Sequence, residues 1–329
     1  MKSNPHLSAG NAERAGIDHA WDQDNQAWWD WYVSLAAGER PQIDVQLAPP
    51  PRAEPPSPAE LLRELGEPYP LTLEHQHFFR TNGFIKLPGV LSPGAVTALR
   101  EQLVAELIAE FGGSLDGGVT DRFLSLEMVW LRNEVLGRFV LSPRIAGICA
   151  GLLGVERVRL YHDNVLSKEP GCRRTPWHYD DTHFPLDTHD VVTAWIPAQP
   201  IPIEMGPLAF AKGIELYREV EKIEFNKHDT SYDEAIGALL QRLGAGVDES
   251  AFSLGEVSFH HNLSLHTAES NRTTVSRIVL ANTFFVDGAR VVDSPTMVSG
   301  DWQKFMPGVG PGEPAASELN PVCWPPESS

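Results

Sequence analysis

Short β-rich runs make up much of the second half of the chain, and this pattern limits the fold more than any other feature. Four runs occupy residues 155–166, 190–198, 256–266 and 276–285, with turns rich in Gly, Pro and Asp between them. Several short strands separated in this way are typical of an antiparallel barrel or sandwich, and not of a parallel α/β sheet. We therefore expect a mainly β fold with helices.

The N-terminal part of the chain is different in character. Residues 21–37 place Trp21, Trp28, Trp29, Tyr32 and Leu35 near one face at helical spacing, and Gly38 follows as a plausible stop. This aromatic face either packs on the main domain or helps to wall a substrate pocket. Residues 41–58 are rich in proline and indicate an extended arm.

A second helical region precedes the β-rich half. A turn at Asn82–Gly83 leads into a short apolar strand, and Ser92 with Pro93 marks the start of a helix. The apolar residues of this helix recur at intervals of three and four: Val96, Leu99, Leu103 and Leu107. We expect a Trp-rich helix with a proline-rich arm over 1–60, a domain over 61–305 and an irregular tail over 306–329. A polar, partly helical insert interrupts that domain at about 215–250.

Composition narrows the classes of partner. The chain has 26 basic and 44 acidic residues, a formal net charge of -18, which disfavours nucleic acid and anionic membranes as partners. Its three cysteines, Cys149, Cys172 and Cys323, form no CxxC pair. The N-terminus lacks the apolar stretch of a signal peptide, and there is no apolar run of about 18 residues. These features predict a cytoplasmic protein.

The residues with the clearest chemistry are His178 and Asp180, in the stretch TPWHYDD. Residues two apart on a strand point to the same face, so an imidazole and a carboxylate could bind one ion together. A third ligand is needed, and His266 is the preferred candidate, with His260 and His261 as alternatives. Two histidines and one carboxylate with open positions form the facial triad of non-haem Fe(II) oxygenases. A zinc hydrolase could use the same set, although the HExxH signature is absent.

Arg277 lies 11 residues after His266, in the next strand-like run. A buried guanidinium can hold a carboxylate through two parallel hydrogen bonds. An oxygenase that uses 2-oxoglutarate needs such a group for the distal carboxylate of its co-substrate. The alternative is that Arg277 is an ordinary surface residue of a strand.

Four blocks, in order over residues 71–285, resemble the phytanoyl-CoA dioxygenase-like (PhyH) family of Fe(II)/2-oxoglutarate oxygenases. The first is LTLEHQHFFRTNGFIKLPGV, and the second is EPGCRRTPWHYDD. The third, VVTAWIPAQPIPIEMGPLAFAKG, carries Trp195 and Gly206, and the fourth, GEVSFHHNLSLHTAESNRTTVSR, carries His266 and Arg277. Met205 departs from the family pattern, in which Asn is usual, and residues 211–214 replace its P-G-S-H turn.

The resemblance implies a double-stranded β-helix, a jelly-roll or cupin-like barrel, with flanking helices. It implies that His178, Asp180 and His266 bind iron, that Arg277 binds 2-oxoglutarate, and that Trp195 and Asn164 lie beside this co-substrate. No catalytic residue is implied beyond the metal ligands.

The implied cofactors are Fe(II), 2-oxoglutarate and O2. The implied reaction is hydroxylation of an unactivated C–H bond of a small molecule, with release of succinate and CO2. The presence of Asp180 favours hydroxylation over halogenation. The alternatives are a metal-binding jelly-roll protein without oxygenase activity and a zinc-dependent hydrolase.

Overall fold

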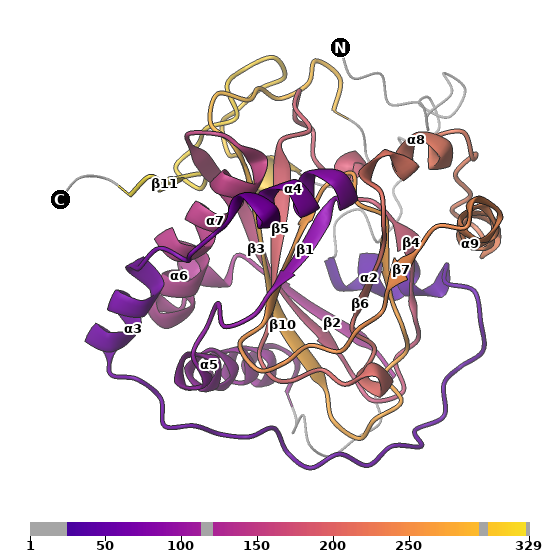
Figure 1. The fold of residues 1–329 in the computed structure, drawn as a ribbon, viewed down its shortest axis with the longest axis horizontal. Coiled ribbons are helices and arrows are strands. Elements are labelled where there is room, and N and C mark those ends of the chain that lie inside the picture. Colours follow the sequence, from indigo (N-terminus) through magenta and orange to yellow (C-terminus); the bar gives the residue numbers. More distant parts are fainter. Residues whose placement is uncertain (1–24, 113–120, 296–301, 327–329) are drawn as a thin grey trace.

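A computed structural model describes residues 25–112, 121–295 and 302–326. Two antiparallel sheets form its centre (Figure 1). The larger sheet has the order β1-β8-β5-β10-β3-β11, and β2 also pairs with β3. Its strands are β1 Phe84–Leu87, β2 Phe123–Glu127, β3 Val158–Lys168, β5 Val191–Pro197, β8 Val257–His261, β10 Arg277–Val286 and β11 Val322–Trp324. The smaller sheet has the order β4-β9-β6-β7 and consists of β4 Thr175–His178, β6 Leu208–Ala211, β7 Val247–Asp248 and β9 His266–Ala268.

Helices cover the outer face of the larger sheet (Figure 1). They are α3 Pro58–Gly66, α4 Leu73–Asn82, α5 Pro93–Phe111, α6 Glu134–Val140 and α7 Pro143–Leu153. The predicted start of α5 is confirmed, because the Ser92 hydroxyl accepts a hydrogen bond from the Ala95 amide and Pro93 is the first helical residue. The four apolar residues predicted for its inner face are all buried.

The segment Glu134–Leu153 is long and apolar enough to cross a membrane by length and composition alone. In the structure it is two helices, α6 and α7, and Ser142 caps the second of them. Their apolar side chains join the core that also contains the outer face of the larger sheet. The apolar character of this segment is therefore used in packing against the sheet.

Three segments flank the two sheets. Helix α2 Asn25–Ser34 lies in the segment predicted as a Trp-rich helix, although Trp21 is outside the described residues. The predicted insert carries α8 Tyr217–Val220 and α9 Ser231–Leu243. The tail was predicted to be irregular, but β11 joins the edge of the larger sheet there, because Val322 and Trp324 pair with the start of β3.

Candidate metal and co-substrate site

A cavity of about 240 Å³ lies between the inner faces of the two sheets. Alternate residues of β3, β5, β8 and β10 supply one wall, because side chains alternate between the two faces of a sheet. Strands β4, β6 and β9 supply the opposite wall. Helix α2 and the segment around Phe305 also line it.

The structure brings His178, Asp180 and His266 together on the side of the smaller sheet. His178 and His266 are directly opposite each other on β4 and β9, and Asp180 follows the end of β4. One ligand atom from each residue lies within 4.8 Å of the others. The Oδ1 atom of Asp180 is 3.6 Å from Nε2 of His178 and 3.8 Å from Nε2 of His266. All three residues line the cavity.

Hydrogen bonds at the far side of each imidazole set its tautomer. Nδ1 of His178 donates to the carbonyl of Pro176 at 2.8 Å, and Nδ1 of His266 donates to that of Ser264 at 3.0 Å. Because a carbonyl only accepts, each Nδ1 carries the proton and each Nε2 presents a lone pair toward Asp180. This is the arrangement usual for metal-binding histidines, so the donor set fits a metal ion.

Electrostatics favour the same protonation states. Burial lowers the pKa of both His178 and His266, so the imidazoles stay neutral at neutral pH. Burial alone would raise the pKa of Asp180, but the imidazoles around it outweigh burial and hold this pKa below its ordinary value; among them, His260 can donate a hydrogen bond to the carboxylate. A carboxylate and two neutral imidazoles are the forms that bind a divalent cation.

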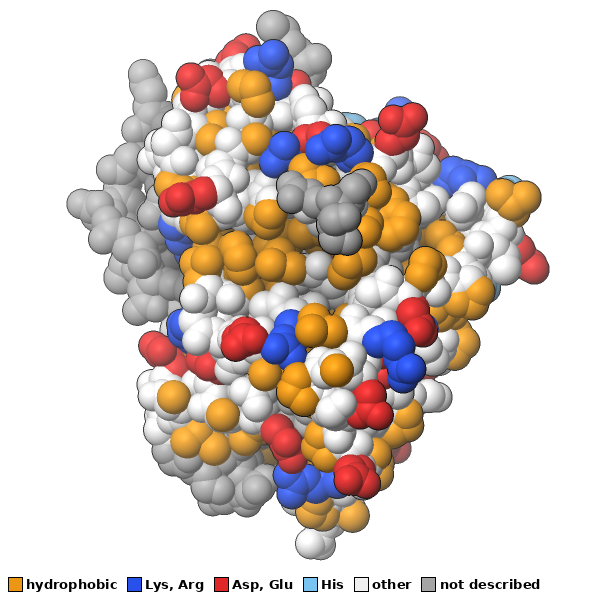
Figure 2. Space-filling view, turned by 90° about the vertical axis from the view of Figure 1, so that its left-hand side faces the viewer, with side chains coloured by type: hydrophobic (Ala, Val, Ile, Leu, Met, Phe, Trp, Pro, Cys, Tyr) orange, Lys and Arg blue, Asp and Glu red, His pale blue; other side chains and the backbone are white. Residues whose placement is uncertain are grey.

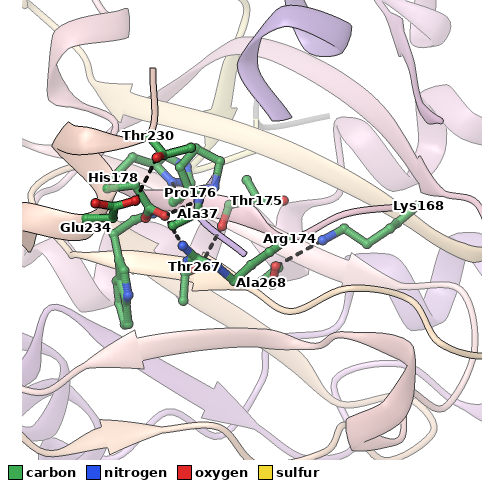
Figure 3. Close-up of polar contacts among 12 residues, drawn as sticks. Ala37, Lys168, Arg174, Thr175, Pro176, His178, Thr230, Glu234, Thr267 and Ala268 are labelled. Atoms are coloured by element: carbon green, nitrogen blue, oxygen red, sulfur yellow. Dashed lines mark hydrogen bonds and ion pairs between the residues drawn. The ribbon is translucent and has the colours of Figure 1, made fainter. Parts of the chain in front are cut away.

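Hydrogen bonds and an ion pair hold the strands that carry the two histidines (Figure 3). The Thr267 hydroxyl donates to the carbonyl of Thr175 at 2.6 Å and accepts from the Arg174 guanidinium at 2.9 Å. Arg174 also forms a buried ion pair with Asp233 of α9, and this carboxylate accepts from the Trp177 amide at 2.7 Å. The insert therefore holds β4 in place immediately before His178.

The two alternative ligands in β8 point to opposite faces of the sheet. His261 lies on the outer side against Phe79 of α4, with 6.2 Å between ring centroids, and does not line the cavity. His260 lines the cavity, and its Nε2 is 3.4 Å from Oδ2 of Asp180. Its buried Nδ1 has no hydrogen-bond partner among the described residues. The proton of a neutral His260 therefore belongs on Nε2, where it faces the carboxylate, and Nε2 is then unable to bind a metal.

The position of His260 beside Asp180 goes beyond the sequence prediction, which gave this residue only as an alternative ligand. The signal was present, since strand alternation places Ser258 and His260 on one face and His261 on the other.

Arg277 lies at the start of β10, at the opposite end of the cavity wall from Thr283. Its side chain is only 1% exposed, and its guanidinium lies over the Trp195 ring, with Cζ 5.2 Å from the centroid. It donates to the carbonyl of Gly206, and its Nε has no hydrogen-bond partner among the described residues. Within the described ranges no carboxylate lies at ion-pair distance from Arg277, so its charge is available to a ligand. Burial lowers the pKa of Arg277 to about 10, so the group is still cationic at neutral pH.

Trp195 and Asn164 lie in one row across the sheet, because both pair with Ala281 of β10. Both line the cavity between Arg277 and the three candidate ligands. The Asn164 carboxamide oxygen accepts from the Ser125 hydroxyl at 2.7 Å, and within the described ranges its amino group makes no hydrogen bond. Lys168, for which the sequence predicted no role, is fully buried opposite Arg277 and donates to the carbonyl of Glu269 at 2.7 Å.

Helix α2 has both of the roles that the sequence left open, packing on the main domain and lining a pocket. Trp29 stacks on Phe123 at 4.5 Å and anchors the helix to β2. Trp28 and Tyr32 stack on each other at 4.7 Å, and both line the cavity. The Tyr32 ring meets that of His178 edge-on at 5.5 Å. The helix therefore both packs on the domain and closes one side of the cavity.

Comparison with known proteins gives a consistent result. A sequence model described as phytanoyl-CoA dioxygenase (PhyH) matches residues 79–279. A probable alpha-ketoglutarate-dependent hypophosphite dioxygenase of Stutzerimonas stutzeri is 24% identical over 221 residues, which are 62% of this chain and 75% of that protein.

Two solved structures from nogalamycin biosynthesis are similar over most of the chain. The non-haem alpha-ketoglutarate-dependent carbocyclase SnoK is 27% identical, with a TM-score of 0.64, over 78% of this chain and 99% of its own. The epimerase SnoN, in complex with Fe3+, alpha-ketoglutarate and nogalamycin RO, is 22% identical, with a TM-score of 0.59, over 81% of this chain and 100% of its own.

Proposed function

The chain belongs to the phytanoyl-CoA dioxygenase (PhyH) family, and on this basis we propose that it hydroxylates an unactivated C–H bond of a small organic molecule. The family, the enzyme class and the cofactors predicted from the sequence are confirmed. The protein is an Fe(II)- and 2-oxoglutarate-dependent dioxygenase that uses Fe(II), 2-oxoglutarate and O2. The proposed products besides the alcohol are succinate and CO2.

The observation that supports this proposal most strongly is the arrangement of His178, Asp180 and His266. Nε2 of each histidine and Oδ1 of Asp180 would hold Fe(II) on one side only, so positions on the other side stay open toward the cavity. Bound Fe(II) supplies the redox chemistry that activates O2 at the expense of 2-oxoglutarate. Because the carboxylate ligand Asp180 is retained, we favour hydroxylation over halogenation.

The co-substrate would lie along the cavity wall, with its distal carboxylate at Arg277. A guanidinium that is buried, cationic and without a carboxylate partner among the described residues suits this role. Trp195 would flank the carbon chain, and the Asn164 amino group would donate to an oxygen of 2-oxoglutarate. The chain thereby orients the co-substrate and keeps water from it.

The remaining expectations become part of the same proposal. The two facing antiparallel sheets suit a double-stranded β-helix, the jelly-roll fold that the family resemblance implies. On the face drawn in Figure 2, Lys and Arg side chains are interspersed with Asp and Glu and form no continuous basic patch. With the net charge of -18, this favours a small-molecule substrate in the cytoplasm over nucleic acid or a membrane surface.

Succinate formation from 2-oxoglutarate tests the proposal. We expect succinate from the purified protein only when Fe(II) and O2 are both present, with a rate that rises when a true substrate is added. Asp180→Ala should abolish this formation, whereas Asp187→Ala, a matched change of an exposed aspartate outside the cavity lining, should leave it unchanged. A protein that retains zinc and forms no succinate under any condition would contradict the proposal.

A further inference from the structure

The cavity has two ends, and the site described above uses only one of them. Arg277 and Thr283 lie six residues apart on β10, and both side chains line the cavity. Thr283 pairs with His162 of β3 and with Thr193 of β5, and Thr193 pairs in turn with His260 of β8. His260 of this row lies 3.4 Å from the candidate ligand Asp180, so the space beyond the row, away from Arg277, is left for the substrate.

A β-bulge shapes the substrate end. Thr283 of β10 pairs with His162, whereas the next residue, Phe284, pairs with Leu160, so Tyr161 has no residue opposite it. A bulge breaks strict alternation and can re-aim a side chain beside a functional site. Here the consecutive residues Tyr161 and His162 both line the cavity. The local irregularity therefore brings two polar aromatic side chains to one place.

Flat aromatic surfaces surround these two residues. The His162 ring stacks on Phe305, with 4.3 Å between centroids and 16° between planes. The Tyr161 ring meets Phe184 edge-on at 4.9 Å. Trp28 and Tyr32 of α2 line the same cavity. Walls of this kind favour a flat apolar ring, because stacked and edge-on contacts add to the free energy gained by removing the ring from water.

The polar groups at this end suit a hydroxyl group. Nδ1 of His162 donates to the carbonyl of Asp163 at 3.1 Å, so Nε2 carries no proton and can accept a hydrogen bond. The Tyr161 hydroxyl is buried, the residue being 1% exposed, and has no partner in the described part of the chain. A buried hydroxyl without a partner costs about 1–3 kcal/mol. A ligand hydroxyl between these two groups could donate to one and accept from the other.

Charge and size restrict the ligand further. Lys304 at this end is 2.5 Å from the carboxylate of Glu127, so the two charges neutralise each other. An anion would find no free cation here among the described residues, in contrast to Arg277 at the co-substrate end. An apolar cavity of about 150 Å³ holds one benzene ring. The cavity, at about 240 Å³, is large enough for one such ring, and the rest of a larger substrate would extend out of it.

We propose that the substrate inserts an uncharged, flat ring bearing a hydroxyl group into this end, with the hydroxyl hydrogen-bonded to His162 and Tyr161. This inference rests on the proposed function, because it assigns the opposite end to 2-oxoglutarate. The proposal distinguishes this chain from the relative named for hypophosphite, because aromatic walls and a neutralised ion pair do not favour the binding of a small anion.

The proposal is tested with benzyl alcohol and three probes that each lack one of the proposed features. Toluene lacks the hydroxyl group, benzoate carries a negative charge, and cyclohexylmethanol has no flat ring. Binding is measured calorimetrically without oxygen, on protein already loaded with Fe(II) and 2-oxoglutarate. We expect benzyl alcohol to bind at least tenfold more tightly than toluene or cyclohexylmethanol, and benzoate to bind most weakly. Tighter binding of benzoate, or equal binding of benzyl alcohol and toluene, would overturn the proposal.

Variants assign the preference to the named residues. His162→Phe keeps an aromatic ring against Phe305 and removes the acceptor, and Tyr161→Phe removes only the hydroxyl. Each should reduce the preference for benzyl alcohol over toluene about tenfold, whereas the exposed control His77→Phe should not. A preference that survives both changes would refute the assignment. The co-substrate site is tested separately by the visible charge-transfer band that forms when 2-oxoglutarate is added to the Fe(II) protein. If this band is absent, the proposed function is contradicted and this inference is not.

Discussion

Replacement of Arg277 by methionine should weaken 2-oxoglutarate binding by one to two orders of magnitude. The guanidinium is buried, and within the described residues it has a backbone carbonyl but no carboxylate as its partner. A hydrogen bond to a charged group contributes about 1.5–3 kcal/mol. Since about 1.4 kcal/mol corresponds to a factor of ten, the loss corresponds to an increase in Kd of about 10- to 150-fold.

The same substitution should not lower the stability of the co-substrate-free protein. Burial lowers the pKa of Arg277 to about 10, which means that folding disfavours its charged form by up to about 3 kcal/mol. Methionine is apolar and flexible, so it can occupy the space beside Trp195 and Phe123. The lost hydrogen bond to Gly206 costs about 1 kcal/mol. We therefore expect an unchanged or higher free energy of unfolding in urea.

Two controls make this prediction specific. Arg277→Lys keeps a charge without the forked geometry and should show an intermediate loss of affinity. Arg157→Met removes a half-exposed arginine that pairs with Asp287 at 2.9 Å, and should leave 2-oxoglutarate binding unchanged. Titration of the Fe(II) protein with 2-oxoglutarate, without oxygen, gives the affinities. Wild-type affinity in Arg277→Met would refute the assignment of the co-substrate end.

Three further substitutions test other parts of the site. His260→Leu should weaken Fe(II) binding about tenfold in competition with a chelating dye, because it removes the group 3.4 Å from Oδ2 of Asp180; unchanged affinity would contradict this. Gly206→Ala should lower the free energy of unfolding by more than about 2 kcal/mol, because φ is +71° and a Cβ would lie 2.0 Å from the Glu269 carbonyl oxygen; wild-type stability would contradict this. Asp163→Asn should stabilise the protein increasingly between about pH 4 and pH 7, and a gain independent of pH would contradict this.

The sign of the Asp163 prediction follows from its surroundings. Burial raises the pKa of this carboxyl from 3.8 to about 7, although the Val129 amide donates to it. The folded protein therefore binds a proton more tightly than the unfolded chain does. That contribution to stability is fully present below about pH 4 and is lost as the pH rises through 7. Asparagine can accept the same hydrogen bond and does not ionise in this range.

Much of the site could be predicted from spacing and resemblance. His178 and Asp180 stand two apart, and His266 and Arg277 follow in a matching block, so the four residues could be named before their distances were known. The structure brings the three candidate ligands together and places Arg277 in the same cavity. Their roles as ligands and co-substrate anchor are still predictions.

Other features could not be predicted because they depend on contacts between distant segments. The run 256–266 has one continuous β-rich pattern, yet β8 and β9 belong to different sheets, with a turn between them. Residues 322–324 form a strand only because the edge of β3 is available to pair with them. The bulge at Tyr161 is likewise a property of the pairing between β3 and β10, and a single strand sequence carries no sign of it.

The central claim is that His178, Asp180 and His266 hold Fe(II) with open positions for 2-oxoglutarate. The most direct test adds Fe(II) and then 2-oxoglutarate to metal-free protein without oxygen and records the visible spectrum. We predict a weak charge-transfer band that requires both components, is lost in His266→Ala and persists in His261→Ala. A band that is absent from the wild-type protein, or one lost in His261→Ala and kept in His266→Ala, would contradict the account.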